Sequence, residues 1–224
     1  MPAACRPGNE YSPAAIRGLL HSVVCGRDPA PPAPMNALEL LNSQHEQVRA
    51  LFEEIEETDD PEDKARLFEE LADAIAAHAT IEEKIFYPAA YGHVRGRRSS
   101  SGLADANATK ELLSEALEEH QAAKRALADL LKTSVEDAQF HAKLELLRDE
   151  LLKHIEKEEG ELFPKVRAEL DVVNLDALGT QMEDLFDDEL EDGAAQKLPL
   201  ELERAAGAKP AKAKAKPKRQ PVRH

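Results

Sequence analysis

The chain has 224 residues, of which 44 are Asp or Glu and 29 are Lys or Arg, so its formal net charge is −15 at neutral pH. Hydrophobic residues make up 42% of the sequence and aromatic residues 4%, and tryptophan is absent. This length fits one domain of about 150 residues with flanking segments. Charged residues interrupt every apolar run before it reaches the ~18 residues that span a membrane. The sequence therefore excludes a membrane-spanning protein, and its two cysteines, Cys5 and Cys25, lie too near the N-terminus to organise a zinc core.

The two ends of the chain differ from its middle. Residues 1–34 finish with the Pro-Ala stretch from Pro29 to Pro34 and are predicted to be a disordered extension. Residues 194–224 hold nine positive and two negative residues, a local charge of +7, and predict a disordered Lys-rich tail. Because residues 1–34 add only +1, the middle carries −23, and an acidic body is expected to bear a basic tail.

Two predicted helices form a first hairpin. Residues 36–57 place apolar residues at alternating steps of three and four, which puts them on one helical face. Asp60 and Pro61 are the expected N-cap and first-turn proline of a second helix, which Pro88 is expected to end. The core positions are Leu38, Leu41, His45, Val48, Phe52 and Ile55 in the first helix, and Leu67, Leu71, Ala74, His78, Ile81 and Ile85 in the second.

A second predicted hairpin follows a Gly-, Ser- and Arg-rich loop at about residues 92–104. Its second helix is expected to end near Pro164, and a shorter acidic fifth helix occupies residues 171–193. The core positions are Leu113, Ala116, His120, Ala123, Leu127 and Leu130, then Phe140, Leu144, Leu147, Leu151, His154 and Glu158, then Leu175, Leu178, Met182, Leu185, Phe186 and Leu190. Four long helices with mostly short connections predict an all-α, up-down-up-down four-helix bundle over residues 35–170.

Each of the four long apolar faces contains one histidine: His45, His78, His120 and His154. A single histidine on such a face is usually a core or boundary residue. Four of them in one core would each need a hydrogen-bond partner or a metal ion. The remaining histidines lie in the ends or a loop, except His141, which is about 140° from His154 around its helix. The four core histidines therefore favour one shared polar site.

Two of these histidines are followed by a glutamate four residues later, as His78–Glu82 and His154–Glu158. This spacing puts both side chains on one helix face. Both segments read His-x-x-x-Glu-Glu, then a hydrophobic pair and a proline, at a constant offset of 76 residues, and the other two core histidines are 75 residues apart. The hairpin is therefore repeated. The competing interpretation is that both glutamates belong to solvated faces.

Four imidazoles and two carboxylates in one helical core suit a pair of divalent transition-metal ions. The carboxylates can bridge the two ions and leave coordination positions open for a small ligand. Structural zinc prefers a closed tetrahedral site and is disfavoured by six ligands without a thiolate. Iron is the first choice of metal and manganese the second.

On these residues the sequence resembles the hemerythrin-like, or HHE cation-binding, family. The resemblance covers residues 36 to about 170 and rests on His45, His78-x-x-x-Glu82, His120 and His154-x-x-x-Glu158. It implies a four-helix bundle with a non-haem di-iron centre held by these six residues. Oxygen-carrying hemerythrins use five histidines and two carboxylates, so this chain departs from the carriers. Members of the wider family are associated with oxygen or nitric oxide handling, iron or redox sensing, and peroxide turnover.

The sequence supports three hypotheses. The first is a cytoplasmic di-iron protein that meets O2, H2O2 or NO, either as a sensor or as a peroxide-consuming, catalase-like enzyme. It needs no catalytic side chain beyond the metal ligands. Tyr87, beside the motif, is expected to pack, and the alternative is that it supports the metal ligands from just outside them. The second is a metal-stabilised interaction module whose basic tail binds an acidic partner or, weakly and without sequence preference, nucleic acid. The third, a helical protein without metal, leaves four core histidines unexplained.

Overall fold

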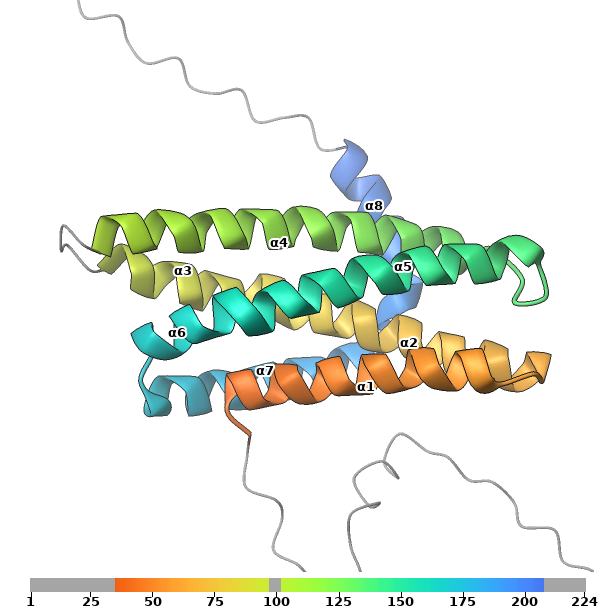
Figure 1. Cartoon of the computed structure of the whole chain (residues 1–224), viewed down its shortest axis with the longest axis horizontal. Coiled ribbons are helices and arrows are strands. Elements are labelled where there is room, and N and C mark those ends of the chain that lie inside the picture. Colours follow the sequence, from red (N-terminus) through yellow and green to blue (C-terminus); the bar gives the residue numbers. More distant parts are fainter. Residues whose placement is uncertain (1–34, 97–101, 208–224) are drawn as a thin grey trace, which may run out of the picture. The chain divides into compact units, whose positions relative to one another are not determined.

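The computed structural model describes residues 35–96 and 102–207, and all its regular elements in these ranges are helices (Figure 1). The predicted N-terminal extension, residues 97–101 of the predicted loop and the lysines of residues 208–224 lie outside the described residues. Over the described ranges, no helix combines the length and apolar character needed to cross a membrane. The predicted four-helix bundle is confirmed, with two additional helices packed against it.

The first hairpin begins as the sequence predicts. Helix α1 spans Ala37–Glu57 and helix α2 spans Pro61–Ile81. The side chain of Asn36 accepts hydrogen bonds from two backbone amides of the first turn of α1, and Asp60 does the same for α2. These caps satisfy amides that have no partner within their own helix, and Pro61 fits the first turn because it lacks one of those amides.

The second helix of each hairpin continues past the proline that was expected to end it. In the first hairpin, a π-helical turn, η2 (Glu82–Phe86), leads into α3 (Tyr87–Gly96), and the Tyr87 amide donates to the Glu82 carbonyl five residues earlier. A proline inside an α-helix loses one hydrogen bond and clashes with the carbonyl four residues before it. The π-helical turn widens the helix at this place, so Pro88 is accommodated and the predicted helix end is wrong.

The second hairpin repeats this construction. Its helices are α4 (Gly102–Leu130), α5 (Ala138–Lys157), the π-helical turn η3 (Glu158–Leu162) and α6 (Phe163–Glu169). Pro164 again follows the π-helical turn and does not end the helix. The predicted loop at residues 92–104 is shorter than expected, because α3 extends to residue 96 and α4 begins at residue 102.

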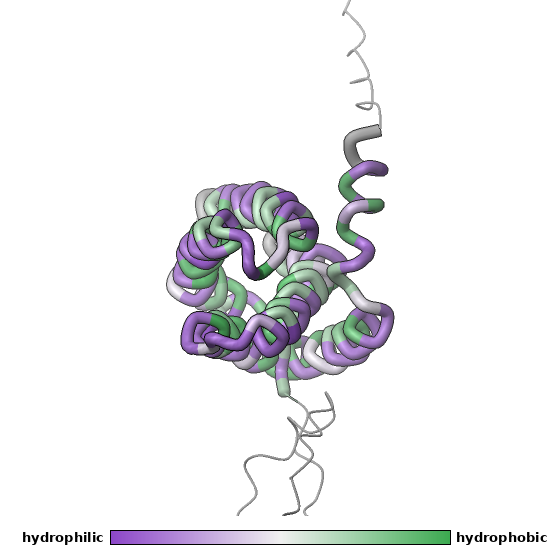
Figure 2. Tube along the Cα trace, turned by 90° about the vertical axis from the view of Figure 1, so that its right-hand side faces the viewer, coloured by the Kyte–Doolittle hydropathy of each residue, from purple (hydrophilic) through white to green (hydrophobic). Residues whose placement is uncertain are grey.

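The core lies between the four long helices. α1 packs against α2 and α5, and α4 packs against α5, α2 and α3. Figure 2, viewed along the helices, shows them surrounding a common axis, with hydrophobic and hydrophilic residues alternating along each one. Of the predicted positions on the four long helices, all are buried except Ile85, which is partly buried and packs on the core.

The predicted fifth helix is α7 (Val172–Glu191), which packs along α1 and α2. Its own side chains Leu175, Met182 and Phe186 are buried. At Gly179 the helix comes so close to the start of α1 that an added Cβ would lie 2.2 Å from the Met35 carbonyl oxygen. A glycine is therefore required for α7 to dock in this position.

Residues 194–207 form helix α8 (Ala194–Gly207), so the disordered tail predicted from residue 194 is wrong for this segment. The helix crosses α2 and α4. Ala194, Ala195 and Leu198 are buried against them, and the Asp73 carboxylate of α2 accepts the Ala195 amide at 2.8 Å. Burial of this short apolar face and the Asp73 cap stabilise the helix. The prediction of disorder rested on the charge of the segment and did not consider this face.

Candidate metal centre

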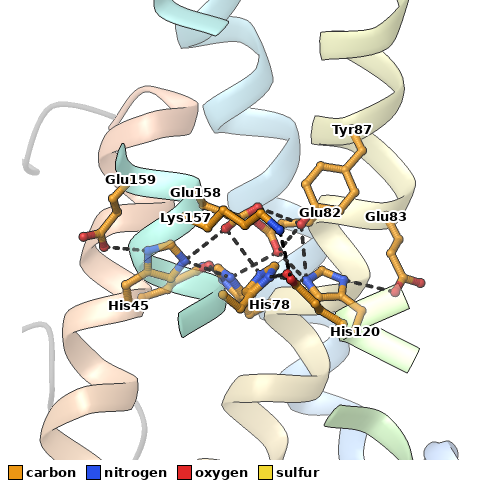
Figure 3. Close-up of polar contacts among 12 residues, drawn as sticks. His45, His78, Glu82, Glu83, Tyr87, His120, Lys157, Glu158 and Glu159 are labelled. Carbon is orange, nitrogen blue, oxygen red and sulfur yellow. Dashed lines mark hydrogen bonds and ion pairs between the residues drawn. The ribbon is translucent and has the colours of Figure 1, made fainter. Parts of the chain in front are cut away.

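The six residues predicted as ligands meet in one buried site inside the bundle. Figure 3 labels five of them: His45, His78, Glu82, His120 and Glu158. No residue of the six is more than 8% exposed, and Glu82 is fully buried. One histidine comes from each long helix, and the two glutamates open the π-helical turns: His45 from α1, His78 from α2, Glu82 from η2, His120 from α4, His154 from α5 and Glu158 from η3.

The four histidines form two pairs. In the first histidine pair, the Nε2 atoms of His45 and His78 are 3.2 Å apart, and in the second, those of His120 and His154 are 3.1 Å apart. The rings within each pair meet edge to face, with centroids 4.9 and 4.7 Å apart. Two nitrogen atoms at this distance either share a proton or direct their lone pairs at a common cation.

The two glutamates connect the histidine pairs. Each carboxylate lies beside one histidine of each pair: Glu82 Oε2 is 3.2 Å from Nε2 of His78 and His120, and Glu158 Oε2 is 3.5 Å from Nε2 of His45 and His154. Within the described structure, Glu82 Oε1 and Glu158 Oε2 are buried without a hydrogen-bond partner. Buried carboxylate oxygens without a partner are costly, so these atoms suit a bound cation.

Each histidine makes a hydrogen bond through its other ring nitrogen, Nδ1, to a side chain outside the site. We call these four side chains the outer partners: Glu159 on His45 (2.8 Å), Gln44 on His78 (2.8 Å), Glu83 on His120 (3.2 Å) and Glu119 on His154 (2.9 Å). An oxygen acceptor at Nδ1 keeps a proton there and leaves Nε2 free to bind a metal ion. All four imidazoles are thereby oriented with Nε2 towards the centre.

The three acidic outer partners are themselves held by cations. Arg49 donates to both oxygens of Glu159 at 3.1 Å, Lys124 donates to Glu83 at 2.8 Å, and Lys157 donates to Glu119 at 3.3 Å. Such contacts fix the carboxylates and so fix the rings that they orient.

Tyr87 also belongs to the site. Its hydroxyl donates to Glu158 Oε1 at 2.7 Å and lies 3.3 Å from both Glu82 Oε2 and His120 Nε2. Burial, reinforced by the two carboxylates, raises the pKa of Tyr87 well above its usual value, so the hydroxyl keeps its proton and remains a donor. The sequence favoured packing for this residue over support of the predicted ligands, and in the structure its hydroxyl lies between the two glutamates.

The buried charges determine where protons sit when no metal is bound. Burial lowers the pKa of His120, but contacts with Glu82 and Glu83 outweigh it and raise this pKa to about 9. Burial raises the pKa of Glu82, but the neighbouring histidines hold it well below its usual range. At His78 burial is the larger effect, and the pKa is lowered. With this pKa, His120 is protonated at neutral pH when no metal is bound.

A small cavity of about 20 Å³ lies against the histidines. A space of this size holds one water-sized molecule, since about 10–15 Å³ is the minimum. Its walls are mainly apolar, and the carboxylates and Tyr87 do not line it: they consist of the four histidines with Val48, Ile75, Ala79, Ala123, Lys124, Leu151 and Ile155. A small molecule there would contact the histidine side of the centre.

Comparison with known proteins identifies the family. The model of the hemerythrin HHE cation-binding domain matches residues 36–166. The chain belongs to this family. The fold is similar to the crystal structure of an HHE cation-binding domain-containing protein from Mycobacterium kansasii, with a TM-score of 0.58 and 24% identity over 74% of this chain and 93% of that one. The donor set and the family are together consistent with cation binding.

A curated relative is larger than this chain. A DNA nickase from Nostoc sp. (strain PCC 7120 / SAG 25.82 / UTEX 2576) is 30% identical over 158 residues, which is 70% of this chain. The matched region covers 40% of the nickase, so the chain matches about two fifths of the length of that relative.

The outer partners were missed from the sequence, although a signal for them exists. Each is adjacent to a predicted ligand: Gln44 and Glu119 precede His45 and His120, and Glu83 and Glu159 follow Glu82 and Glu158. They lie off the predicted apolar faces, and the chain has 44 acidic residues, so polarity alone does not distinguish the outer partners from other surface residues. Their matching positions in both copies of the repeat are the signal that distinguishes them.

Proposed function

We propose that the chain binds two iron ions through His45, His78, Glu82, His120, His154 and Glu158, and reacts with a small oxygen-containing ligand, O2 or H2O2. The observation that carries this proposal is the orientation of the four histidines, whose Nδ1 atoms are all occupied by oxygen acceptors while their Nε2 atoms converge. Metal-binding histidines are typically oriented in this way. Carboxylate and imidazole ligands suit iron, with manganese as the second choice.

In this proposal, each group of residues at the centre has its own role. The first histidine pair would hold one ion and the second pair the other, with Glu82 and Glu158 shared between them. Iron supplies reversible one-electron oxidation and open coordination positions. The chain supplies orientation through the outer partners, exclusion of bulk water through burial, and a proton held on the Tyr87 hydroxyl beside both carboxylates.

The cavity supports a small uncharged ligand. Its volume of about 20 Å³ is too small for a larger organic substrate, and aliphatic side chains form the part of its wall that lies away from the histidines and Lys124. O2 and H2O2 are small and uncharged enough to enter such a space. This argues for a reaction of a small ligand at the centre itself.

The experiment is to load the full chain with Fe²⁺ under anaerobic conditions, measure bound iron, and follow the visible spectrum as air or peroxide is added. We expect about two irons per chain and a spectral change with either oxidant. Ala123→Val narrows the cavity and should slow the change without loss of iron, whereas Ala128→Val, at a buried position of α4 that does not line the cavity, should leave it unchanged. Equal rates in both variants would contradict a role for the cavity. A visible spectrum that does not change with either oxidant would mean that the bound metal has only a structural role.

A second candidate function is contact with DNA. It is favoured by the relative named as a DNA nickase and by the six positive residues between Lys209 and Arg219. A run of lysines without acidic residues binds phosphates weakly and with strong salt dependence. The acidic body opposes such binding within a Debye length of about 8 Å at physiological salt.

Deleting residues 208–224 tests this candidate without disturbing α8. We expect the full chain to bind duplex DNA at ~50 mM salt and the truncated chain to lose that binding, while both retain the same iron content. Absence of binding by the full chain at this salt concentration would end the proposal.

A further inference from the structure

The two hairpins supply the outer partners in a symmetric pattern that is broken at one place. The residue after each glutamate, Glu83 or Glu159, bonds the first histidine of the opposite hairpin. The residue before each first histidine bonds the second histidine of its own hairpin, and here the copies differ: Gln44 bonds His78, whereas Glu119 bonds His154. Three histidines therefore have a charged acceptor, and His78 alone among the four has a neutral one.

A second position in the repeat changes together with this one. Lys157, which donates to Glu119, corresponds to Ile81 at the 76-residue offset. Ile81 is fully buried in the core. The second hairpin thus holds a carboxylate with its cation where the first holds an amide and an apolar side chain. The difference is a matched pair of changes, so the first hairpin lacks both charges at this place.

A contribution to folding stability does not explain why a glutamine occupies position 44. Gln44 is 5% exposed, and its Nε2 atom has no hydrogen-bond partner in the described structure. A buried donor without a partner destabilises the folded state. What Gln44 does provide is an acceptor that holds the His78 Nδ1 proton without placing a negative charge beside the ring.

We infer that the two metal positions are unequal, and that Gln44 and Glu119 set the order in which they fill. A carboxylate acceptor makes a ligating imidazole a stronger donor, and loss of such a partner typically weakens metal binding 10–100-fold. The second histidine pair has two carboxylate acceptors, so the ion between His120 and His154 binds first. The ion at the first pair binds second and exchanges more readily. This inference rests on the proposed two-metal centre.

The test must identify the positions, because two adjacent divalent ions repel each other and would give two binding steps even in a symmetric site. Metal-free full-length protein is titrated with Co²⁺ by calorimetry, with the visible spectrum of Co²⁺ recorded at each step. We expect His154→Ala to abolish the tighter step and His78→Ala to abolish the weaker one. Equal weakening of the tighter step by both substitutions would overturn the inference.

The outer partners are tested by variants that exchange charge but keep shape. Glu119→Gln should weaken the tighter step about 10–100-fold, and Glu119 is sufficiently exposed, at 37% of its side chain, for the variant to fold. Gln44→Glu should strengthen the weaker step and narrow the gap between the two. Unchanged dissociation constants in Glu119→Gln would overturn the assignment. Failure of the wild-type chain to bind Co²⁺ at all would instead refute the two-metal proposal.

Discussion

The two helical hairpins have the same backbone construction and differ in the polar side chains around the centre. Tyr87 of the first hairpin stacks on His120, with ring centroids 5.5 Å apart, and its counterpart Phe163 stacks on His45 at 5.8 Å. Both aromatic rings support a histidine of the opposite hairpin, but only Tyr87 adds a hydroxyl to the centre. The extra helix α7 also covers α1 and α2 of the first hairpin. The repeat therefore preserves the geometry of the centre, while single polar substitutions make its two halves different.

The largest expected effect comes from removing one ligand from each hairpin. His78→Ala combined with His154→Ala should abolish binding of both ions and lower the melting temperature, because metal binding contributes to folding stability. Metal analysis and thermal unfolding of the same preparations measure both effects. His141→Ala is the control, since this side chain is 67% exposed and pairs with Glu145 on its own helix. Unchanged metal content in the double variant would show that the ions bind elsewhere.

Equivalent core positions test whether the hairpins are equally important for stability. Leu71 and Leu147 are 76 residues apart in the sequence and are both fully buried. Replacing either with Ala should lower the free energy of unfolding by about 2–5 kcal/mol, measured by urea denaturation of the metal-free protein. A loss below about 1 kcal/mol at one position only would mean that its hairpin does not unfold together with the rest.

Gly179 tests the docking of α7 on the first hairpin. An added Cβ would lie 2.2 Å from the Met35 carbonyl oxygen and 2.8 Å from the Ala37 amide nitrogen, both backbone atoms. Gly179→Ala should therefore cost about 1–3 kcal/mol through overpacking. Gly160→Ala is the matched control, because nothing lies within 4 Å of its added Cβ, and loss of a helical glycine should leave stability unchanged or raise it by about 0.5–1 kcal/mol. Equal stability of the two variants would contradict the close approach.

Metal binding should also depend on pH. In the metal-free protein the pKa of His120 is raised to about 9, and a metal ion binds only the neutral ring. Metal affinity should therefore rise by about tenfold per pH unit for this displaced proton up to about pH 9 and level off above it. The same raised pKa stabilises the metal-free fold fully below about pH 6.5, and this contribution is lost as the pH rises through about 9. Chelator competition between about pH 6 and 9 measures the first effect, and a flat affinity would refute it.

The sequence predicted the bundle and the six converging residues because both depend on helical phase. Residues such as His45 and His120 occupy core positions that a regular spacing of three and four fixes. Helical phase is also the reason that packing was the preferred role for Tyr87. It follows Glu82 by five residues, which is about 140° around an ordinary α-helix, and only the π-helical turn brings its hydroxyl to within 3.3 Å of that carboxylate.

The helix ends and α8 could not be predicted from local pattern alone. Pro88 and Pro164 are strong helix-ending signals, and the π-helical turns that accommodate them depend on the packing of the whole bundle. At the start of helix α8, the Ala195 amide donates a hydrogen bond to the Asp73 carboxylate, 122 positions earlier in the chain. Such a contact exists only once the bundle has folded, so neither charge nor periodicity reveals it.

X-ray absorption at the iron edge of the fully loaded protein tests the central claim most directly, because it reports both the ligand atoms and any neighbouring metal. Two histidine pairs joined by Glu82 and Glu158 predict about two imidazole ligands per iron and a second iron within roughly 4 Å. Iron with no imidazole ligand, or with no second iron at that distance, would contradict the account.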